Sequence, residues 1–374
     1  MKWIRRSPVQ SDKPASTASP LSTPLDVTLH IGTGRAGSTS IQVFLRENRE
    51  RLGELGVLYP RTPGGARHLR LGLFVKSITE LESSPEWRRQ KQSDQESFRK
   101  AFRRRLFSEI ENSGLSKVLL SDEILFGSSE QALRRLSRFT HRIADSLRLV
   151  AYLRRQDDHM VSRYQQGVKI GWVTRLADWA REDMSGLYDY HARLRTWQQL
   201  TEPSEFVVRR FEPDRFVDGS LLQDFLDAAR IDARADEFAQ VPNLNKSLDA
   251  EGVEFLRLLN IHRIEQEGAT PGLIDNRALV RRLTEVSTGP TLTLPDSVLD
   301  EFMEQWEASN RAVARGFLGD ETGQLFRAPR KTHNTTTEQR FDPARLGHFI
   351  TLLELPPRMH SLLGRVAERE AKAL

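Results

Sequence analysis

The sequence of 374 residues contains no cysteine. Disulfide bonds, thiolate metal ligands and a cysteine nucleophile are therefore excluded. No apolar run reaches the ~18 residues that a membrane-spanning helix needs. The 9 histidines show neither an HExxH motif nor a paired spacing typical of metal ligands. The sequence thus predicts neither a transmembrane segment nor a metal site.

A strong excess of one charge is also lacking. Lysine and arginine number 56 and aspartate and glutamate number 51, which leaves a formal net charge of +5. This small excess suits an anionic cofactor or a sulfated or phosphorylated acceptor, but it does not indicate nucleic acid. The apolar share of 38% and the charged share of 29% are typical of a soluble protein with a sizeable core.

The segment Leu29 to Asn48, LHIGTGRAGSTSIQVFLREN, has the pattern of a buried strand, a glycine-rich turn and a helix. Alternating apolar residues lead into Gly32, Gly34 and Gly37, which allow the backbone to turn tightly. Apolar residues at helical spacing resume at Ile41 and predict an amphipathic helix from Ser38 to Leu52. At the N-terminus of such a helix, backbone N–H groups converge and the helix dipole favours an anion. The segment therefore predicts a phosphate-binding turn.

Two well-known phosphate-binding patterns match this turn in part. The three glycines fit the dinucleotide motif GxGxxG, but the next strand runs into Pro60 and Arg61, where an acidic ribose partner is expected. Because an arginine suits a cofactor with a 2′-phosphate, this alternative stays open. The first and last glycines also have the Walker spacing, with Thr39 in place, but Ser38 occupies the lysine position. The cation lies instead inside the loop, at Arg35. There it would lie beside a phosphate chain shorter than the one that a Walker lysine contacts.

The arrangement resembles the 5′-phosphosulfate loop of sulfotransferases, in which a lysine or arginine, a small residue, glycine and two hydroxyl residues follow one another. Here the order is Arg35, Ala36, Gly37, Ser38, Thr39. A second signature of that family is an arginine after a strand with a serine eight positions later. Arg154 and Ser162, in LRLVAYLRRQDDHMVSRYQQGVKIG, match it. Over residues 25–328 the chain is similar to bacterial sulfotransferases of the carbohydrate type.

The resemblance implies a three-layer α/β domain of P-loop type, with a central, mostly parallel sheet flanked by helices. It also implies the co-substrate 3′-phosphoadenosine 5′-phosphosulfate, whose sulfuryl group moves to an acceptor hydroxyl by in-line displacement without a metal. The implied acceptor is a carbohydrate or glycolipid. Arg35 would stabilise the charge on the oxygen between phosphorus and sulfur. The residues implied to hold the donor are Gly34, Arg35, Ala36, Gly37, Ser38, Thr39, Ser40, Arg154 and Ser162.

Such a transfer needs a base for the proton of the acceptor hydroxyl. The segment Lys117 to Ser121 has the pattern of a buried parallel strand, and Glu123 follows its end, at the edge where ligands of open α/β sheets bind. Since many carbohydrate sulfotransferases use a glutamate, the resemblance implies that Glu123 is the base. Helix capping or an ion pair is the structural alternative. His68, expected in an exposed loop rich in proline and glycine, is the second candidate base.

The chain divides into three regions by composition. Residues 1–24 have the pattern of a disordered basic tail, residues 25–328 form the expected sulfotransferase domain, and residues 329–374 are a polar linker with a helical appendage. The appendage covers the core or makes a subunit contact. We expect the protein to be cytoplasmic.

Several residues leave two interpretations open. The chain from Trp172 to Leu200 is expected to be helical, and its Trp172, Trp179 and Tyr188 either line an acceptor cleft or belong to the core. Lys246 and Ser247, in the loop at residues 241–248, either touch the donor or cap the next helix. The basic residues of the helix expected from Asp94 to Ser113 either form a solvated face or contact an acidic acceptor; these are Arg99, Lys100, Arg103, Arg104 and Arg105.

Two other classes of protein could use the same turn. A nucleotide kinase or another NTPase would bind ATP with magnesium, although the missing lysine after Gly37 argues against this class. In a non-catalytic binding module, Arg154 and Glu123 would be ordinary ion-pairing residues and the nucleotide would only stabilise the fold.

Overall fold

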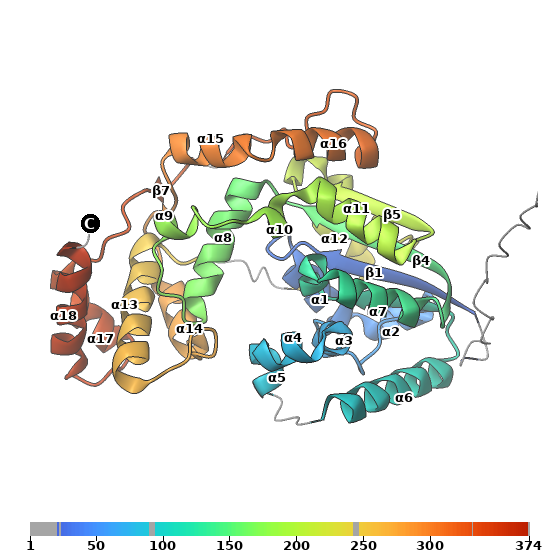
Figure 1. Cartoon of the computed structure of the whole chain (residues 1–374), viewed down its shortest axis with the longest axis horizontal. Helices are drawn as coiled ribbons and strands as arrows, with labels where there is room; N and C mark the ends of the chain where they lie inside the picture. The colour runs from blue at the N-terminus through green and yellow to red at the C-terminus, as the bar shows by residue number, and fades with distance from the viewer. Residues whose placement is uncertain (1–20, 22–23, 90–93, 242–246, 331, 373–374) are drawn as a thin grey trace, which may run out of the picture.

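The computed structural model describes residues 21, 24–89, 94–241, 247–330 and 332–372. A five-stranded parallel sheet, in the order β2-β3-β1-β4-β5, lies at its centre (Figure 1). The strands are β1 (Leu25–Gly32), β2 (Val57–Leu58), β3 (Lys117–Ser121), β4 (Ala144–Leu153) and β5 (Glu205–Arg210). The structure thus confirms the α/β fold class and the expected strands.

Apolar side chains pack on both faces of the sheet, as expected of strands buried between two layers of helices. On one face, Leu29 and Ile31 belong to a large core shared with helices α3, α6, α7 and α11. On the other, Val150 and Tyr152 belong to a smaller core shared with α1, α2 and α12. The helices on the face of the large core are α3 (Leu69–Val75), α6 (Gln95–Ser113), α7 (Glu130–Thr140) and α11 (Tyr190–Thr201). Those on the face of the smaller core are α1 (Ser38–Glu47), α2 (Arg49–Glu54) and α12 (Leu221–Ala228). The three-layer arrangement is therefore confirmed.

Strand β1 lies between β3 and β4, which decides what can meet at the edge of the sheet. His30 of β1 is level with Ser121 of β3 and with Val150 of β4. Because all three strands run in the same direction, the segments that follow them emerge at the same edge. These segments are the glycine-rich loop, the turn containing Glu123 and the start of the helix after Arg154.

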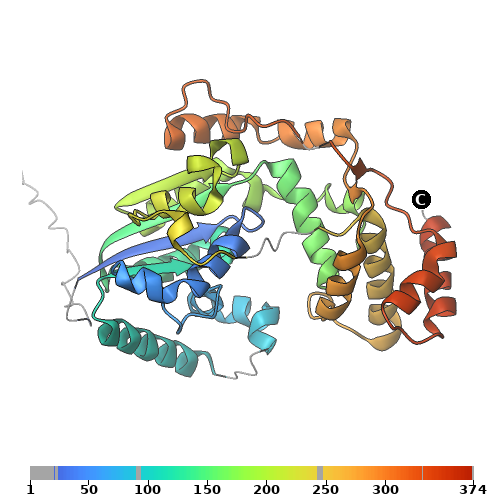
Figure 2. The ribbon, with the colours of Figure 1, turned by 180° about the vertical axis from the view of Figure 1, so that it is seen from behind.

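A second group of helices lies at one end of the molecule and begins with α8, next to the sheet (Figures 1 and 2). This group contains α8 (Gln156–Lys169), α13 (Ala250–Glu267), α14 (Arg277–Val286), α17 (Leu346–Leu352) and α18 (Met359–Lys372). Helices α15 (Asp296–Glu304) and α16 (Glu307–Leu318) run along one side and connect this group with the sheet (Figure 1). The shorter helices are α4 (Ile78–Ser83), α5 (Pro85–Arg89), α9 (Leu176–Trp179) and α10 (Ser185–Tyr188).

The C-terminal appendage packs against α13. Arg257 of α13 is almost completely buried, and its Nη2 lies 2.8 Å from Glu254 Oε1 and 2.8 Å from Glu370 Oε2 of α18. The ring of Phe255 stacks on that of Phe349, with 4.8 Å between centroids. The expected polar linker contributes β7 (Thr335–Thr336), which pairs with β6 (Thr291–Leu292). The appendage therefore covers part of the core.

Two expected helices differ from those observed. The helix expected from Ser38 to Leu52 is broken at Asn48, whose amide donates to the carbonyl of Phe44 and accepts from the backbone of Ala239 (2.8 Å). The sequence around Asn48 does not indicate a contact with Ala239, which is 191 positions away. The helical segment expected between Trp172 and Leu200 is divided into α9, α10 and α11.

Most of the tail expected at residues 1–24 lies outside the described residues. Leu21 is described and is 7% exposed, packed within the large core. No helix in the part of the chain that the structure describes combines the length and apolarity needed to cross a membrane.

Candidate functional site

The loop between β1 and α1 depends on glycine at two close approaches. Gly32 has φ +106°, and a Cβ there would lie 3.0 Å from the Cα of Glu123. Gly37 has φ +75°, and a Cβ there would collide with Leu221 and lie 2.8 Å from the ring of Phe211. At both positions the backbone has a positive φ, and a side chain would not fit. The loop is consequently held tightly between the segment after β3 and the start of α12.

Helix α1 begins at Ser38, directly after this loop. Its N-cap residue, Gly37, has no side chain to cap the first turn. The N–H groups of the first helical turn have no intrahelical partner, and the helix dipole adds partial positive charge there. The helix N-terminus therefore has the properties of an anion site, as the sequence predicts, with Ser38 buried and Thr39 exposed beside it.

Arg35 and Arg154 bring the two sequence signatures into contact. The Nη1 of Arg154 donates to the carbonyl oxygen of Arg35 at 2.9 Å. The Nε of Arg35 donates to the Oγ of Ser162 on α8, also at 2.9 Å. Burial lowers the pKa of both guanidinium groups, and the charge of Arg154 lowers the pKa of Arg35 further. Two like charges are thus held together at the edge of the sheet, where the nearby carboxylates of Glu123 and Asp158 offset part of their repulsion.

Glu123 lies directly against the loop. It begins the short 3-10 helix η1 (Glu123–Gly127) after β3, and a Cβ at Gly34 would lie 3.6 Å from its Cγ. The Nε2 of Gln42, on α1, donates to Oε2 of Glu123 at 2.6 Å, and the Nε of Arg67 lies 3.8 Å from Oε1. The structure therefore places the expected base beside the loop, with its carboxylate oriented by an amide that the sequence did not reveal.

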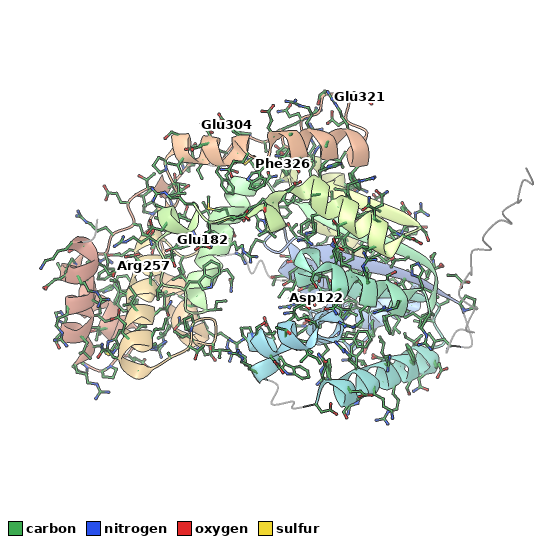
Figure 3. All side chains as sticks on the ribbon, viewed as in Figure 1. Asp122, Glu182, Arg257, Glu304, Glu321 and Phe326 are labelled. Carbon is green, nitrogen blue, oxygen red and sulfur yellow. The ribbon has the colours of Figure 1, made fainter. Side chains whose placement is uncertain are left out.

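Asp122, the neighbour of Glu123, performs the structural role. Its Oδ1 accepts from the backbone N–H of Ile124 at 3.2 Å and from the Nε of Arg67 at 2.8 Å. The side chain is completely buried, and burial raises the pKa of Asp122 to about 6 in spite of the arginine. Asp122 is labelled in Figure 3. Helix capping, one of the two interpretations weighed for Glu123, thus belongs to Asp122.

The expectation that His68 lies in an exposed loop is wrong, because its ring is completely buried. The ring stacks on Tyr59 with 4.3 Å between centroids, and its Nδ1 accepts from the backbone N–H of Ser121 at 3.2 Å. Burial lowers the pKa of His68 to about 3, so the ring is neutral. The loop folds back onto β3 through these contacts, which its proline and glycine content does not indicate. His68 supports the segment before Glu123.

Sequence reasoning missed three further groups around the loop. His159 of α8 is buried, and its ring lies close to the backbone of Gly34. Lys169, at the end of α8, is half-buried, and burial together with Arg35 lowers its pKa to about 8. Gln42 donates to the Oγ of Ser121 (3.2 Å) as well as to Glu123. The helical spacing of Lys169 from Ser162 was the available signal, because residues seven apart share a helix face.

The interpretations left open for the aromatic residues are resolved in favour of the core. Trp179 and Tyr188 are buried, and Trp172 packs against Trp179 with 5.2 Å between centroids. None of the three is an exposed platform for a sugar ring.

The basic residues of α6 form a solvated face, apart from one that bonds to the backbone. Arg99 donates to the carbonyl oxygen of Phe74 at 3.1 Å. The other four, Lys100, Arg103, Arg104 and Arg105, are exposed. In the loop before α13, Lys246 lies outside the described residues and Ser247 is exposed.

A cavity of about 270 Å³ lies at the opposite edge of the sheet, near the start of the strands. Its lining includes Val27, Lys117, Arg148 and Arg230. The loop, Glu123 and Arg154 are at the carboxyl ends of the strands, so this cavity is separate from the candidate site.

Three buried histidines predict that the protein is sensitive to acid. Burial lowers the pKa of His30 and of His68 to about 3, and that of His159 well below its usual range. Below pH 6.5 the unfolded chain binds protons that the folded chain does not. Stability is therefore complete above this pH and falls as the pH decreases. At pH 5 the neutral rings of His30 and His68 each lower the free energy of unfolding by about 2 kcal/mol, and His159 lowers it further, while Asp122, whose pKa is raised, increases it by about 1 kcal/mol.

Urea unfolding at pH 7 and pH 5 measures this effect. We expect the free energy of unfolding to fall by several kcal/mol, and to fall less in His68→Gln because one titrating group is removed. The control is His141→Gln, since His141 is exposed. A free energy of unfolding that is the same at both pH values would contradict the burial of neutral histidines.

A partial relative of this chain is found in Archaeoglobus fulgidus, where it is named an uncharacterized protein. The two are 29% identical over 182 residues, which cover 46% of this chain and 46% of the relative. The chain thus spans about half the length of the curated relative it matches. No family model matches the chain. No solved structure matches it significantly.

Proposed function

We propose that the protein transfers a sulfuryl group from 3′-phosphoadenosine 5′-phosphosulfate to an acceptor hydroxyl. The observation that carries the proposal is the contact between the two signatures: Arg154 donates to the carbonyl of Arg35, and Arg35 donates to Ser162. Residues 119 and 127 positions apart in the sequence thus meet at one edge of the sheet. Two clustered cations beside a helix N-terminus suit a ligand with anionic groups at both ends.

The donor would lie with its 5′-phosphosulfate on the loop and its 3′-phosphate near Arg154. The loop would supply the N–H groups of Gly34 to Ser40 together with the hydroxyl groups of Ser38 and Thr39. The guanidinium of Arg154 presents a fork of N–H donors that fits phosphate oxygens. Ser162 now accepts from Arg35, so its hydroxyl would either keep that contact or turn to the 3′-phosphate.

In the reaction, the acceptor oxygen forms a bond to sulfur while the bond from sulfur to the 5′-phosphate oxygen breaks. The acceptor proton passes to the carboxylate of Glu123, which the amide of Gln42 orients. Negative charge grows on the phosphate oxygen as the bond breaks, and Arg35 stabilises it. The products are the sulfated acceptor and 3′-phosphoadenosine 5′-phosphate.

The proposal includes a carbohydrate or glycolipid as acceptor and a cytoplasmic location. Both come from the sequence resemblance. Fractionation of cells and assay of each fraction would check the location.

Ligand binding separates this proposal from the other classes of protein. Isothermal titration with 3′-phosphoadenosine 5′-phosphate and with ATP plus magnesium should favour the bisphosphate, and radiolabelled donor should then pass its sulfate to an acceptor. Preference for ATP with magnesium would support an NTPase instead. Binding of the bisphosphate without transfer to any acceptor would support a non-catalytic module.

Glu123→Gln should slow the transfer and leave the donor affinity unchanged. Glutamine keeps the shape of the side chain but cannot accept the acceptor proton, and loss of a general base costs about 10²–10⁴-fold in rate. Single-turnover transfer and titration with the bisphosphate measure the two quantities separately. Glu130→Gln is the matched control, because Glu130 is exposed on α7. A weaker donor affinity with a normal rate would assign Glu123 a structural role.

A further inference from the structure

Helix α8 presents a polar face to the loop after β1. The hydrogen bond from Arg35 Nε to Ser162 Oγ shows that this face points toward the loop. Residues seven apart in an α-helix lie within about 20° of each other around the axis. Lys169 therefore shares the face of Ser162, and Gln166 lies on it between the two. We call Ser162, Gln166 and Lys169 the α8 polar face.

The ammonium group of Lys169 has a like charge, that of Arg35, in its surroundings. Within the ranges that the structure describes, no hydrogen bond or ion pair joins the side chain of Lys169 to another residue. The residue is half-buried, and burial and the charge of Arg35 lower its pKa to about 8. At neutral pH the group is mostly protonated, so two cations lie near each other in a partly buried place. A charge in such a place is stabilised by a partner of opposite sign.

The positions of Arg154, Ser162 and Lys169 along the chain indicate on which side of the reacting group Lys169 lies. Arg154 directly precedes the helix region, Ser162 is two turns into α8, and Lys169 is its last residue. With a rise of 1.5 Å per residue, the Cα of Lys169 lies ~10 Å beyond that of Ser162 along the helix axis and ~20 Å from the start of α8 at Gln156. If the donor extends from Arg154 to the loop, its reacting end is beside Arg35. Lys169 then lies past that end, on the side from which an acceptor must approach.

We propose that Gln166 and Lys169 of the α8 polar face bind the acceptor and that Lys169 pairs with an acidic group on it. The acceptor is then an acidic carbohydrate, a hydroxyl-bearing sugar with a carboxylate, phosphate or sulfate on the same or the adjacent sugar unit. The amide of Gln166 can both donate to and accept from sugar hydroxyl groups. The inference rests on the proposed function, because the position of the donor defines the acceptor side.

Paired acidic and neutral sugars test this inference. The probes are trisaccharides of glucuronic, galacturonic and mannuronic acid and their methyl esters, titrated at low ionic strength into the full chain, with and without saturating 3′-phosphoadenosine 5′-phosphate. We expect at least one acid to bind about tenfold or more tightly than its ester, since charge pairing in a partly buried site discriminates by this amount. In Lys169→Met the ratio of the ester and acid dissociation constants should fall to about one, and in Lys169→Arg most of the preference for the acid should return. Lys100→Met, a change at an exposed lysine of α6, is the matched control.

Three results would overturn the inference. The first is a ratio of ester to acid dissociation constants that Lys169→Met leaves unchanged. The second is equal weakening of acid and ester binding in that variant, which indicates a structural role. The third is a wild-type protein that binds none of the acids more tightly than its ester. Failure of the proposed function is a separate result, because it appears as the absence of bisphosphate binding. An acid preference that depends on Lys169 would then still identify an acidic ligand for this face.

Discussion

Replacing Arg35 by alanine should abolish detectable sulfuryl transfer while the protein stays folded. Arg35 is the cation inside the loop, and a preorganised group of this kind is worth about 10²–10³-fold in rate when it stabilises developing charge. Its contact with Arg154 uses the backbone carbonyl, which alanine retains. The substitution removes a hydrogen bond to Ser162 but also removes repulsion from Arg154. The melting temperature should therefore change little.

Transfer from radiolabelled donor and thermal unfolding measure the two parts of this prediction. Arg35→Lys should keep part of the activity, because lysine retains the charge but lacks the planar fork of donors. Arg46→Ala is the matched control, since Arg46 is exposed at the end of α1 and pairs with Glu47. Retained turnover in Arg35→Ala would remove this residue from the mechanism.

The parts of the fold that the sequence predicted are those determined by local pattern. Strand β3 is mostly apolar and β4 ends in the apolar run from Leu149 to Leu153, as expected for buried parallel strands. Helix α6 has Phe98 and Phe102 on its buried side, in agreement with their spacing of four. The loop and α1 follow from the glycines and from the apolar residues after them. In each case a short stretch of chain contains the whole signal.

The features that the sequence did not predict depend on contacts between distant segments. The break at Asn48 depends on Ala239, and the burial of His68 depends on the backbone of Ser121. The order of the strands belongs to this class as well, since no local pattern states which strand is the neighbour of β1. Without that order, the meeting of Arg35 and Arg154 is an expectation from family resemblance only.

The candidate site shows the same division. Arg35, Arg154 and Glu123 lie directly after strand ends, where the motifs that carry the family resemblance place them. Gln42 and Lys169 lie within helices whose patterns are ordinary. Their proximity to the loop follows from how α1 and α8 pack at the edge of the sheet, which a single sequence does not contain.

Arg154→Ala should weaken binding of 3′-phosphoadenosine 5′-phosphate about 10²-fold or more, because truncating one partner of a buried charge pair costs several kcal/mol. The loss should be much smaller for adenosine 5′-phosphosulfate, which lacks the 3′-phosphate. Arg154 also donates to the carbonyl of Arg35, so some loss through the loop is expected for both ligands. The informative quantity is therefore the ratio of the two dissociation constants, measured by titration calorimetry.

The neighbouring arginine supplies the control for this ratio. Arg155 lies 3.0 Å from Asp157 Oδ1 and donates to the carbonyl of Ala328 at 3.2 Å, so its guanidinium already has partners within the fold. Arg155→Ala should leave the ratio unchanged, and Arg154→Lys should restore only part of it, because a single ammonium replaces a fork of donors. Equal losses for both ligands in Arg154→Ala would mean that Arg154 only supports the loop. The 3′-phosphate would then need another anchor, and the assignment of the donor would fail.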